Sequence, residues 1–370
     1  MASKIRVGLI GGNVARGWGS AAHLPALAYL PEFEVTAVAT TKLESATATA
    51  HAFNIPLALG SAEELVTRPE VDVVVVSVKV PRHDEVIRAA LAAGKHVFSE
   101  WPLGVSLEQA SALADLATTA RVTHLIGLQG LRSPSVAFAR DLIAAGRIGR
   151  VLSVSVVAAG GLGGTSIAQA NVYAVDRAAG ASVLTISTGH LLSALEGVLG
   201  PLHEVAGIVA TLNKHTTVFE TGESVEVTAP DQVVVTGRLG DGGVVSINVQ
   251  GGAPHALGFL LRIVGSEGAL DIRPYGGRGG AIHISDWAIS AMAADGSIEE
   301  FVAPAGYGGV PEAVPAGPPR NVAALYQELG AAINDRRPAS PGFDTAVRYH
   351  RLIETIQRSA DSGARQNVGG

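Results

Sequence analysis

The first twenty residues place a short apolar segment directly before a run of glycines. Residues 4–10 are mostly Val, Ile and Leu, and four of the nine residues 11–19 are glycine. Glycine lets a backbone approach a pyrophosphate closely, and the N–H groups at the start of a following helix favour its negative charge. The order of strand, Gly-rich turn and helix therefore predicts a dinucleotide-binding unit.

The glycine motif departs from the usual G-x-G-x-x-G spacing. Read from Gly11, the second and third glycine positions hold Asn13 and Arg16. Asn tolerates a positive φ better than most residues, so we expect Asn13 to adopt the tight conformation of the turn. The later glycines predict a loop about one helical turn longer than usual, and His23 is expected to order the start of the helix. An ordinary strand-to-helix turn is the alternative interpretation.

Apolar β segments then alternate with Ala-rich helical segments. Residues 71–78 contain a run of valines typical of a buried strand, and Ser61 and Glu64 have the spacing of a helix-start capping box. The predicted strands are 33–39, 71–78, 95–100 and 122–128, and the predicted helices are 43–53, 61–65, 83–93 and 107–120. This alternation predicts a doubly wound parallel sheet, and we assign residues 1–128 to an NAD(P)-binding Rossmann domain.

The pattern changes after residue 128. Helices are predicted at 133–145, 181–199, 322–334 and 344–359, but most other segments are β runs. These runs are 151–159, 203–212, 232–239, 244–249, 259–264 and 269–272, with Gly-rich hairpin turns at 240–243 and 265–268. We assign residues 129–370 to a C-terminal α/β substrate and dimerisation domain, an α+β unit with a large, mostly antiparallel, open-faced sheet.

Length and composition restrict the class of protein. The chain has 370 residues, which is too long for one average domain, and it contains no cysteine. Thiolate nucleophiles, disulfides and Cys-ligated metals are therefore excluded. The net charge of −6 without a basic tract argues against direct nucleic-acid binding. No apolar run has transmembrane length and no signal peptide is recognised, so we expect a cytoplasmic protein without membrane contact.

Several motifs together resemble the glucose–fructose oxidoreductase / inositol dehydrogenase (Gfo/Idh/MocA) family. They lie at 89–97, at 100–103 with the sequence Glu-Trp-Pro-Leu, and at 127–132, 146–149 and 189–190. The resemblance covers nearly the whole chain. It implies a Rossmann domain, then an open-faced α/β domain that contacts substrate and often dimerises. Members of the family mostly transfer hydride between NAD(P) and a sugar or polyol.

Two positions depart from that family's pattern. Its Glu-Lys-Pro motif places a Lys beside nicotinamide and substrate, and here that position is Trp101; an Asp four residues before the second-domain His is here Ile186. With the long glycine loop, Tyr173 and Asp176, these departures resemble the fungal galactose-regulon repressor branch, which keeps a dinucleotide site and acts as a regulatory protein. Biliverdin reductase, of the same superfamily, also lacks the Lys and remains a reductase.

The candidate cofactor residues follow the carboxyl ends of the predicted strands, where open α/β sheets bind ligands. No acid follows the second strand to bind a ribose 2′-hydroxyl, so we favour NADP over NAD through Lys42, with a solvated Lys42 as the alternative. Glu100 is expected at the nicotinamide ribose or, alternatively, as a solvated carboxylate. The full set is Gly11, Gly12, Asn13, Val14, Ala15, Arg16, Trp18, Thr40, Thr41, Lys42, Val78, Lys79, His83, Glu100, Trp101 and Gln129.

The candidate catalytic residues are His190, Asp176 and Lys79. Trp101 cannot transfer a proton at neutral pH; it is expected to stack on a ligand ring or to fill space. An imidazole titrates near neutral pH, which favours His190, although a lone His in an apolar helix is more often a core residue. His83 is expected to be structural or to line the cofactor. The candidate substrate-binding residues are Trp101, Arg132, Tyr173, Asp176 and His190.

Two functions follow from these residues. The first, which we favour, is an oxidoreductase of sugar metabolism that uses NADP or NAD on a sugar-like substrate held between the domains. The second is a catalytically silent dinucleotide sensor that acts through a regulatory protein partner. Alternating apolar residues in 233–235 and 244–249 predict an uncovered sheet face, and therefore a homodimer or a dimer of dimers. No His, Asp or Glu cluster has metal-ligand spacing, so no metal is predicted.

Overall fold

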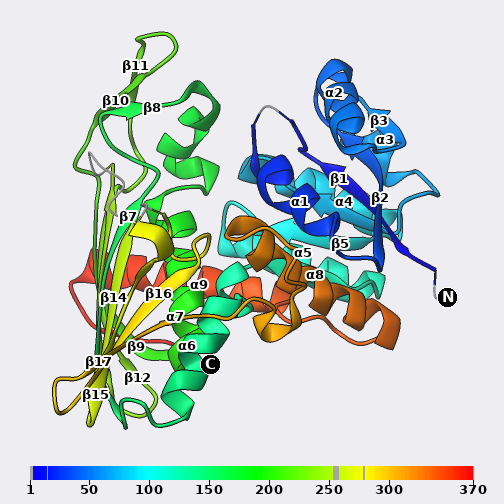
Figure 1. The fold of residues 1–370 in the computed structure, drawn as a ribbon. Helices are drawn as coiled ribbons and strands as arrows, with labels where there is room; N and C mark the ends of the chain where they lie inside the picture. The colour runs from blue at the N-terminus through cyan, green and yellow to red at the C-terminus, as the bar shows by residue number, and fades with distance from the viewer. Residues whose placement is uncertain (1–2, 15, 253–257, 278–279, 370) are drawn as a thin grey trace. The chain divides into compact units, whose positions relative to one another are not determined.

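The computed structural model of the chain describes all residues except 1–2, 15, 253–257, 278–279 and 370 (Figure 1). The chain forms two compact units. The first contains residues 1–128 and 308–348, and the second contains residues 129–307 and 349–370. Each unit is built on its own large sheet.

A six-stranded parallel sheet forms the centre of the first unit and confirms the predicted doubly wound fold. Its strands are β1 (Ile5–Ile10), β2 (Phe33–Ala39), β3 (Leu57–Leu59), β4 (Val73–Val76), β5 (His96–Glu100) and β6 (His124–Gly127), in the order β3-β2-β1-β4-β5-β6. The valines of β4 are fully buried, as expected for a strand covered on both faces. The strand order reverses between β1 and β4, and such a switch point is where ligands of these sheets bind.

Helices follow the strands of this sheet along the chain. They are η1 (Gly19–His23), α1 (Leu24–Leu27), α2 (Leu43–Phe53), α3 (Ala62–Val66), η2 (Val80–Arg82), α4 (His83–Ala92) and α5 (Leu107–Ala120). The predicted start at Ser61 is confirmed, because its hydroxyl accepts a hydrogen bond from the Glu64 amide at 3.2 Å and satisfies one exposed N–H group. The first helix begins at Gly19 with a π-helical turn, earlier than the predicted start near His23.

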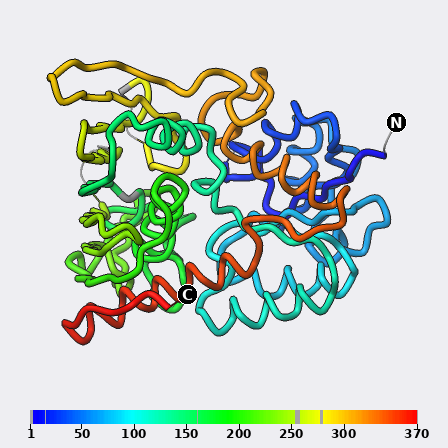
Figure 2. The backbone as a smooth tube through the Cα atoms, turned by 90° about the horizontal axis from the view of Figure 1, so that it is seen from below, coloured from blue at the N-terminus to red at the C-terminus, as the bar shows by residue number. Residues whose placement is uncertain are grey.

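A helix from late in the chain, α8 (Pro318–Asp335), packs on the first unit beside η1 and α1 (Figure 2). Its apolar side chains Val322, Tyr326 and Leu329 are fully buried in the same cluster as Leu24 and Phe33. Burying such side chains contributes roughly 1.5–3 kcal/mol each. The sequence assignment placed this helix in the second domain, because an amphipathic pattern does not reveal which core a helix will join.

A nine-stranded, mostly antiparallel sheet forms the second unit. Its strands are β7 (Val151–Gly160), β9 (Leu202–Ala210), β12 (Gln232–Leu239), β13 (Val244–Gly251), β14 (Phe259–Gly265), β15 (Gly268–Pro274), β16 (Trp287–Ala293), β17 (Ile298–Val302) and β18 (Gln366–Asn367). The order is β17-β16-β15-β14-β7-β13-β12-β9-β18, with β7 and β13 parallel. Both predicted Gly-rich turns join antiparallel neighbours, β12 to β13 and β14 to β15.

Helices and a small sheet complete the second unit. They are η3 (Gln129–Leu131), α6 (Pro134–Ala144), η4 (Gln169–Val175), η5 (Arg177–Ala179), η6 (Val183–Ser187), α7 (Thr188–Leu199) and most of α9 (Phe343–Ser362), with strands β8 (Ser166–Ile167), β10 (His215–Val218) and β11 (Ser224–Glu226). The stretch Arg177–Leu199 is long and apolar enough to cross a membrane, but 78% of its apolar window is buried inside the protein. This burial identifies the stretch as a core segment of the second unit.

The nine-stranded sheet has one buried and one exposed face. On β13, Val245, Ile247 and Val249 are buried, whereas Val244 is 48% exposed. Ile208 of β9 and Val157 of β7 lie in one cross-strand row of the exposed face and are 66% and 46% exposed. Figure 1 shows α6 and α7 on one side of this sheet. The predicted open face is therefore present in the described part of the chain.

Candidate functional site

The turn after β1 brings three glycines close to neighbouring atoms. At Gly11, which has a φ of 100°, a Cβ would lie 2.0 Å from the carbonyl oxygen of Ser77 beyond β4. At Gly12 a Cβ would lie 2.8 Å from Leu9, and at Gly19 it would lie 3.1 Å from the Cα of Gly12. A side chain at any of these positions would displace its neighbours. The glycines thus allow the turn after β1 to pack closely at the switch point of the sheet, where doubly wound folds bind ligands.

Asn13 does not adopt the positive φ expected from the sequence, and Gly17 adopts it instead, with a φ of 104°. The amide of Arg16 donates to the carbonyl oxygen of Asn13 at 3.1 Å and closes a small bridge. The amide of Val14 donates to Thr49 Oγ1 at 2.9 Å, which ties the loop to α2. The prediction for Asn13 was wrong because the glycines on either side of it make the turns.

Two buried donors lie just beyond this bridge. The Trp18 ring packs partly buried on the core of the first unit. Its Nε1 and the Ser20 hydroxyl are buried without a hydrogen-bond partner among the described residues. Buried donors in this state cost free energy and call for an explanation. Sequence reasoning missed Ser20, and the predicted cofactor residue Ala15 lies outside the described residues.

The end of β2 leads into an exposed turn. The Thr40 hydroxyl donates to the carbonyl oxygen of Lys42 at 2.7 Å, and the Ser45 hydroxyl donates to the same oxygen at 2.9 Å. These bonds form the entry to α2, with Lys42 at its N-cap. The side chains of Thr41 and Lys42 are exposed. Thr40 is therefore used by the turn itself, and Thr41 and Lys42 remain available to a ligand.

The end of β4 is tied to the turn after β5 by a buried histidine. His83 is 1% exposed, with Nδ1 at 2.8 Å from the Pro102 carbonyl oxygen and Nε2 at 3.0 Å from that of Val78. Burial lowers the pKa of His83, so the neutral ring donates to one carbonyl and faces the other. Both nitrogens are occupied by the main chain, which argues against the predicted cofactor contact. Lys79, between these residues, is exposed.

Glu100 ends β5 at the same edge of the sheet. Its side chain is 13% exposed, and its Oε1 lies 3.0 Å from Nε2 of His23. Nδ1 of His23 lies 2.8 Å from the hydroxyl of Tyr326 on α8. His23 therefore contacts a candidate ligand residue, and its side chain makes no capping hydrogen bond at the start of α1. Sequence reasoning missed Tyr326, because 303 residues separate it from His23 and no local pattern links them.

Trp101 occupies the position of the family's Lys. Its side chain is only 4% exposed, and its peptide bond to Pro102 is cis. A ring this deeply buried fills space at the end of β5, which agrees with the structural alternative considered for it. Its indole has no group that transfers a proton at neutral pH.

In the second unit, His190 on α7 stacks on His283. The ring centroids are 3.7 Å apart and the planes differ by 7°. His190 is 5% exposed, and its Nδ1 has no hydrogen-bond partner among the described residues. Burial, with a smaller effect of His283, holds the pKa of His190 well below its usual value. The ring is therefore neutral at pH 7, which corrects the expectation that it titrates near neutrality. His283 carried no sequence signal.

The other candidates of the second unit lie on short helices. The Asp176 carboxylate is exposed and accepts a hydrogen bond from the Ala178 amide at 2.9 Å, so it caps η5. Tyr173 is half-buried on η4, and burial raises the pKa of its hydroxyl, which stays protonated at neutral pH. Gln129 is fully buried at the start of the unit, and Arg132 is exposed. Asp176 thus has a structural function that the sequence did not reveal.

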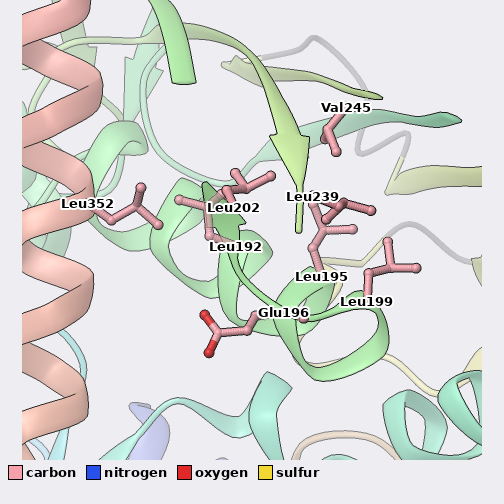
Figure 3. Close-up of a pocket in the computed structure, with 9 residues that line it drawn as sticks. Leu192, Leu195, Glu196, Leu199, Leu202, Leu239, Val245 and Leu352 are labelled. Carbon is pink, nitrogen blue, oxygen red and sulfur yellow. The ribbon is translucent and has the colours of Figure 1, made fainter. Parts of the chain in front are cut away.

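A cavity of about 10 Å³ lies elsewhere, between α7 and the large sheet (Figure 3). Its only charged lining residue is Glu196, whose carboxylate accepts a hydrogen bond from Tyr349 at 2.7 Å. None of the candidate residues lines this cavity, and its volume holds at most about one water molecule. Within the described residues, no group of three or more His, Asp or Glu side chains is placed to hold a metal ion.

Comparisons with known proteins find matches in two parts of the chain. Residues 5–128 match the oxidoreductase family with an NAD-binding Rossmann fold, Gfo/Idh/MocA. Residues 134–274 match the Gal80p C-terminal domain. The "Dehydrogenase aclE" of Aspergillus oryzae is 36% identical over 190 residues, which are 51% of this chain and 50% of that protein. The galactose/lactose metabolism regulatory protein GAL80 of Saccharomyces cerevisiae is 28% identical over 73% of this chain and 67% of its own length.

Solved structures agree on the fold. A super-repressor mutant of Gal80p from Saccharomyces cerevisiae superposes with a TM-score of 0.84 at 24% identity, over 100% of this chain and 99% of that one. A levoglucosan dehydrogenase, solved with NADH and levoglucosan, superposes with a TM-score of 0.81 at 21% identity, over 99% and 100% of the two chains. At these identities the likeness establishes the fold alone. Dehydrogenases and Gal80 regulators thus share this architecture.

Proposed function

From the presence of a Gfo/Idh/MocA NAD-binding domain and a Gal80-like C-terminal domain in one chain, we propose that the protein is an NAD(P)-dependent oxidoreductase acting on a sugar or polyol. The observation that carries the proposal is the closely packed glycine turn at Gly11, Gly12 and Gly19, which we call the glycine cradle. It lies at the switch point of the parallel sheet, where doubly wound folds bind dinucleotides.

The residues around the cradle fit such a cofactor. The start of the helix at Gly19 favours a negatively charged pyrophosphate, and the buried donors of Trp18 and Ser20 supply hydrogen bonds to its oxygens. Lys42, exposed at the end of β2, favours the 2′-phosphate of NADP over the free hydroxyl of NAD. Glu100 accepts hydrogen bonds from the nicotinamide ribose. When bound, the nicotinamide supplies the hydride donor or acceptor for the reaction.

The chain's own residues must hold and move the proton of the substrate hydroxyl. Trp101 replaces the family's Lys and excludes water at the end of β5. Asp176 is engaged as a helix cap. That leaves Lys79, which is exposed, and the neutral imidazole of His190 as candidate groups for the proton transfer. A relay of this kind contributes about 10²–10⁴ in rate.

A second candidate function is a catalytically silent dinucleotide sensor that acts by protein contact. Trp101 favours it, because the family's Lys is absent and its place is taken by a buried indole. The similarity to GAL80, a regulatory protein by its name, extends over 73% of the chain and adds support. In either function the exposed face of the nine-stranded sheet suits a homodimer, and a cytoplasmic location is proposed for both.

A cofactor titration followed by a turnover screen tests the proposal. Calorimetry with NADP⁺ and NAD⁺ is expected to show saturable binding, with NADP⁺ the tighter ligand. The absorbance of reduced nicotinamide then reports turnover with aldoses and polyols. Saturable binding without turnover on any sugar supports the sensor. No binding of either dinucleotide at millimolar concentration contradicts both functions.

A further inference from the structure

A buried line of polar groups connects α8 to the cofactor edge of the first unit. The hydroxyl of Tyr326 lies 2.8 Å from Nδ1 of His23, and Nε2 of His23 lies 3.0 Å from Oε1 of Glu100. His23 and Tyr326 are both 0% exposed, whereas the Glu100 side chain is 13% exposed. The line therefore begins in the core and ends at the one member that reaches the surface.

The chemistry of the three groups sets the direction of the hydrogen bonds. Burial, with a smaller effect of Glu100, holds the pKa of the Tyr326 hydroxyl well above its usual value. The hydroxyl therefore keeps its proton and donates a hydrogen bond to Nδ1 of His23. A carboxylate only accepts hydrogen bonds. With Nδ1 accepting from Tyr326, the His23 ring carries a proton on Nε2 and donates a hydrogen bond to Glu100. Both ring nitrogens of His23 thus have a hydrogen-bond partner.

The surroundings fix the orientation of this line. The Phe98 ring meets the His23 ring edge-on with centroids 5.1 Å apart, and the Phe33 ring meets the Tyr326 ring with centroids 5.4 Å apart. On the other side, a Cβ at Gly127 would lie 2.7 Å from the Glu100 carboxylate. Aromatic packing thus holds the imidazole, and a glycine leaves the space that the carboxylate occupies.

We propose that His23 and Tyr326 are positioning residues that hold the Glu100 carboxylate for the nicotinamide ribose of the cofactor. The inference rests on the proposed binding of a dinucleotide. It makes α8 part of the cofactor site, although this helix follows the last strand of the Rossmann sheet only after most of the second unit. The bond from His23 fixes one oxygen of the Glu100 carboxylate. It thereby sets the orientation in which the carboxylate faces the ribose hydroxyls.

The proposal predicts a loss of affinity confined to one half of the cofactor. Tyr326→Phe removes only the hydroxyl, and His23→Leu removes the donor to Glu100. Calorimetry measures the affinity of each variant for NADP⁺ and NAD⁺ and, for comparison, for ADP, which carries the adenosine half and lacks the nicotinamide ribose. We expect Tyr326→Phe to weaken dinucleotide binding about three- to tenfold and His23→Leu about ten- to hundredfold. Binding of ADP is expected to stay within about twofold of wild type.

Further variants separate positioning from general damage. His23→Gln keeps one donor and one acceptor and is expected to regain most of the affinity lost in His23→Leu. In a Glu100→Gln background, Tyr326→Phe is expected to add no further loss, since its effect acts through Glu100. Tyr349→Phe is the matched control, because this fully buried tyrosine of the second unit donates to Glu196 at 2.7 Å. It is expected to leave binding unchanged.

Two outcomes overturn the inference. One is a wild-type protein that binds dinucleotide and a Tyr326→Phe variant that binds it equally well. The other is an equal loss of ADP and dinucleotide affinity, which indicates damage to the whole unit. If His23→Leu does not fold, Tyr326→Phe and His23→Gln carry the test alone. Failure of the proposed function is distinct, because then the wild-type protein itself binds no dinucleotide.

Discussion

The imidazoles of His190 and His283 stack face to face, with centroids 3.7 Å apart and planes 7° from parallel. Two charged rings at this separation would repel strongly in a buried setting, and burial lowers the pKa of both, that of His283 to about 3. Both rings are therefore neutral at pH 7. A neutral His190 takes up a proton or shares a hydrogen bond, but it does not enter the reaction as an imidazolium.

Replacing His190 with Asn tests its part in turnover. The amide preserves hydrogen bonding but cannot accept a proton, so turnover is expected to fall by about 10²-fold, roughly 2.7 kcal/mol of barrier. Cofactor affinity is expected to stay near wild type, because the glycine cradle belongs to the other unit. His350→Asn, at another buried histidine of the second unit, is the control. Equal turnover rates for the wild type and His190→Asn would instead make Lys79 the candidate for transferring the proton of the substrate hydroxyl.

The same lowered pKa values predict a loss of stability in mild acid. The unfolded chain takes up protons near pH 6.5, whereas the folded protein keeps His190 and His283 neutral. The contribution of these two histidines to the free energy of unfolding is therefore constant above about pH 6.5 and falls as the pH drops below it. At pH 5 each such histidine costs about 2 kcal/mol. Urea midpoints at pH 7.5 and 5 measure the effect, and His190→Leu is expected to reduce it; identical midpoints in the wild type would disprove it.

The cofactor half of the chain was predictable because its signals are local. The valine run of β4 and the glycines after β1 each specify a structure from a few adjacent residues, and both were placed correctly. The error at Asn13 is also local. Propensity indicates which residue tolerates a positive φ, but the path of the loop decides which residue needs it, and Gly17 was available.

The remaining site residues could not be predicted because their partners are distant in sequence. Tyr326 meets His23 only after α8 has packed on the first unit, and His283 meets His190 only across the second unit. Asp176 has the residue type of an acid catalyst, yet its carboxylate caps a helix. The order of residues along the chain and their types do not predict these pairings, which arise from tertiary packing.

The exposed face of the nine-stranded sheet predicts a dimer. Ile208 is 66% exposed in a row of that face, so Ile208→Lys places a charge in the expected interface and is expected to yield monomers. Light scattering at micromolar concentration is expected to give twice the 37.7 kDa chain mass for the wild type. Phe219→Lys, 69% exposed and outside the large sheet, is the control and should not dissociate the dimer. A wild-type mass of one chain would refute the interface.

Lys42→Asp is expected to reverse the preference between the two cofactors. The side chain of Lys42 is exposed at the N-cap of α2, directly after the strand whose end contacts the adenosine ribose in such folds. A carboxylate there repels a 2′-phosphate and accepts a hydrogen bond from a free 2′-hydroxyl. Loss of one charge-assisted contact costs roughly 1.5–3 kcal/mol, about ten- to hundredfold in the affinity ratio. Calorimetry with NADP⁺ and NAD⁺ measures that ratio, and Lys214→Asp, an exposed lysine of the second unit, controls for the change in net charge. An unchanged ratio would show that Lys42 faces solvent and that cofactor choice is made elsewhere in the turn after β2.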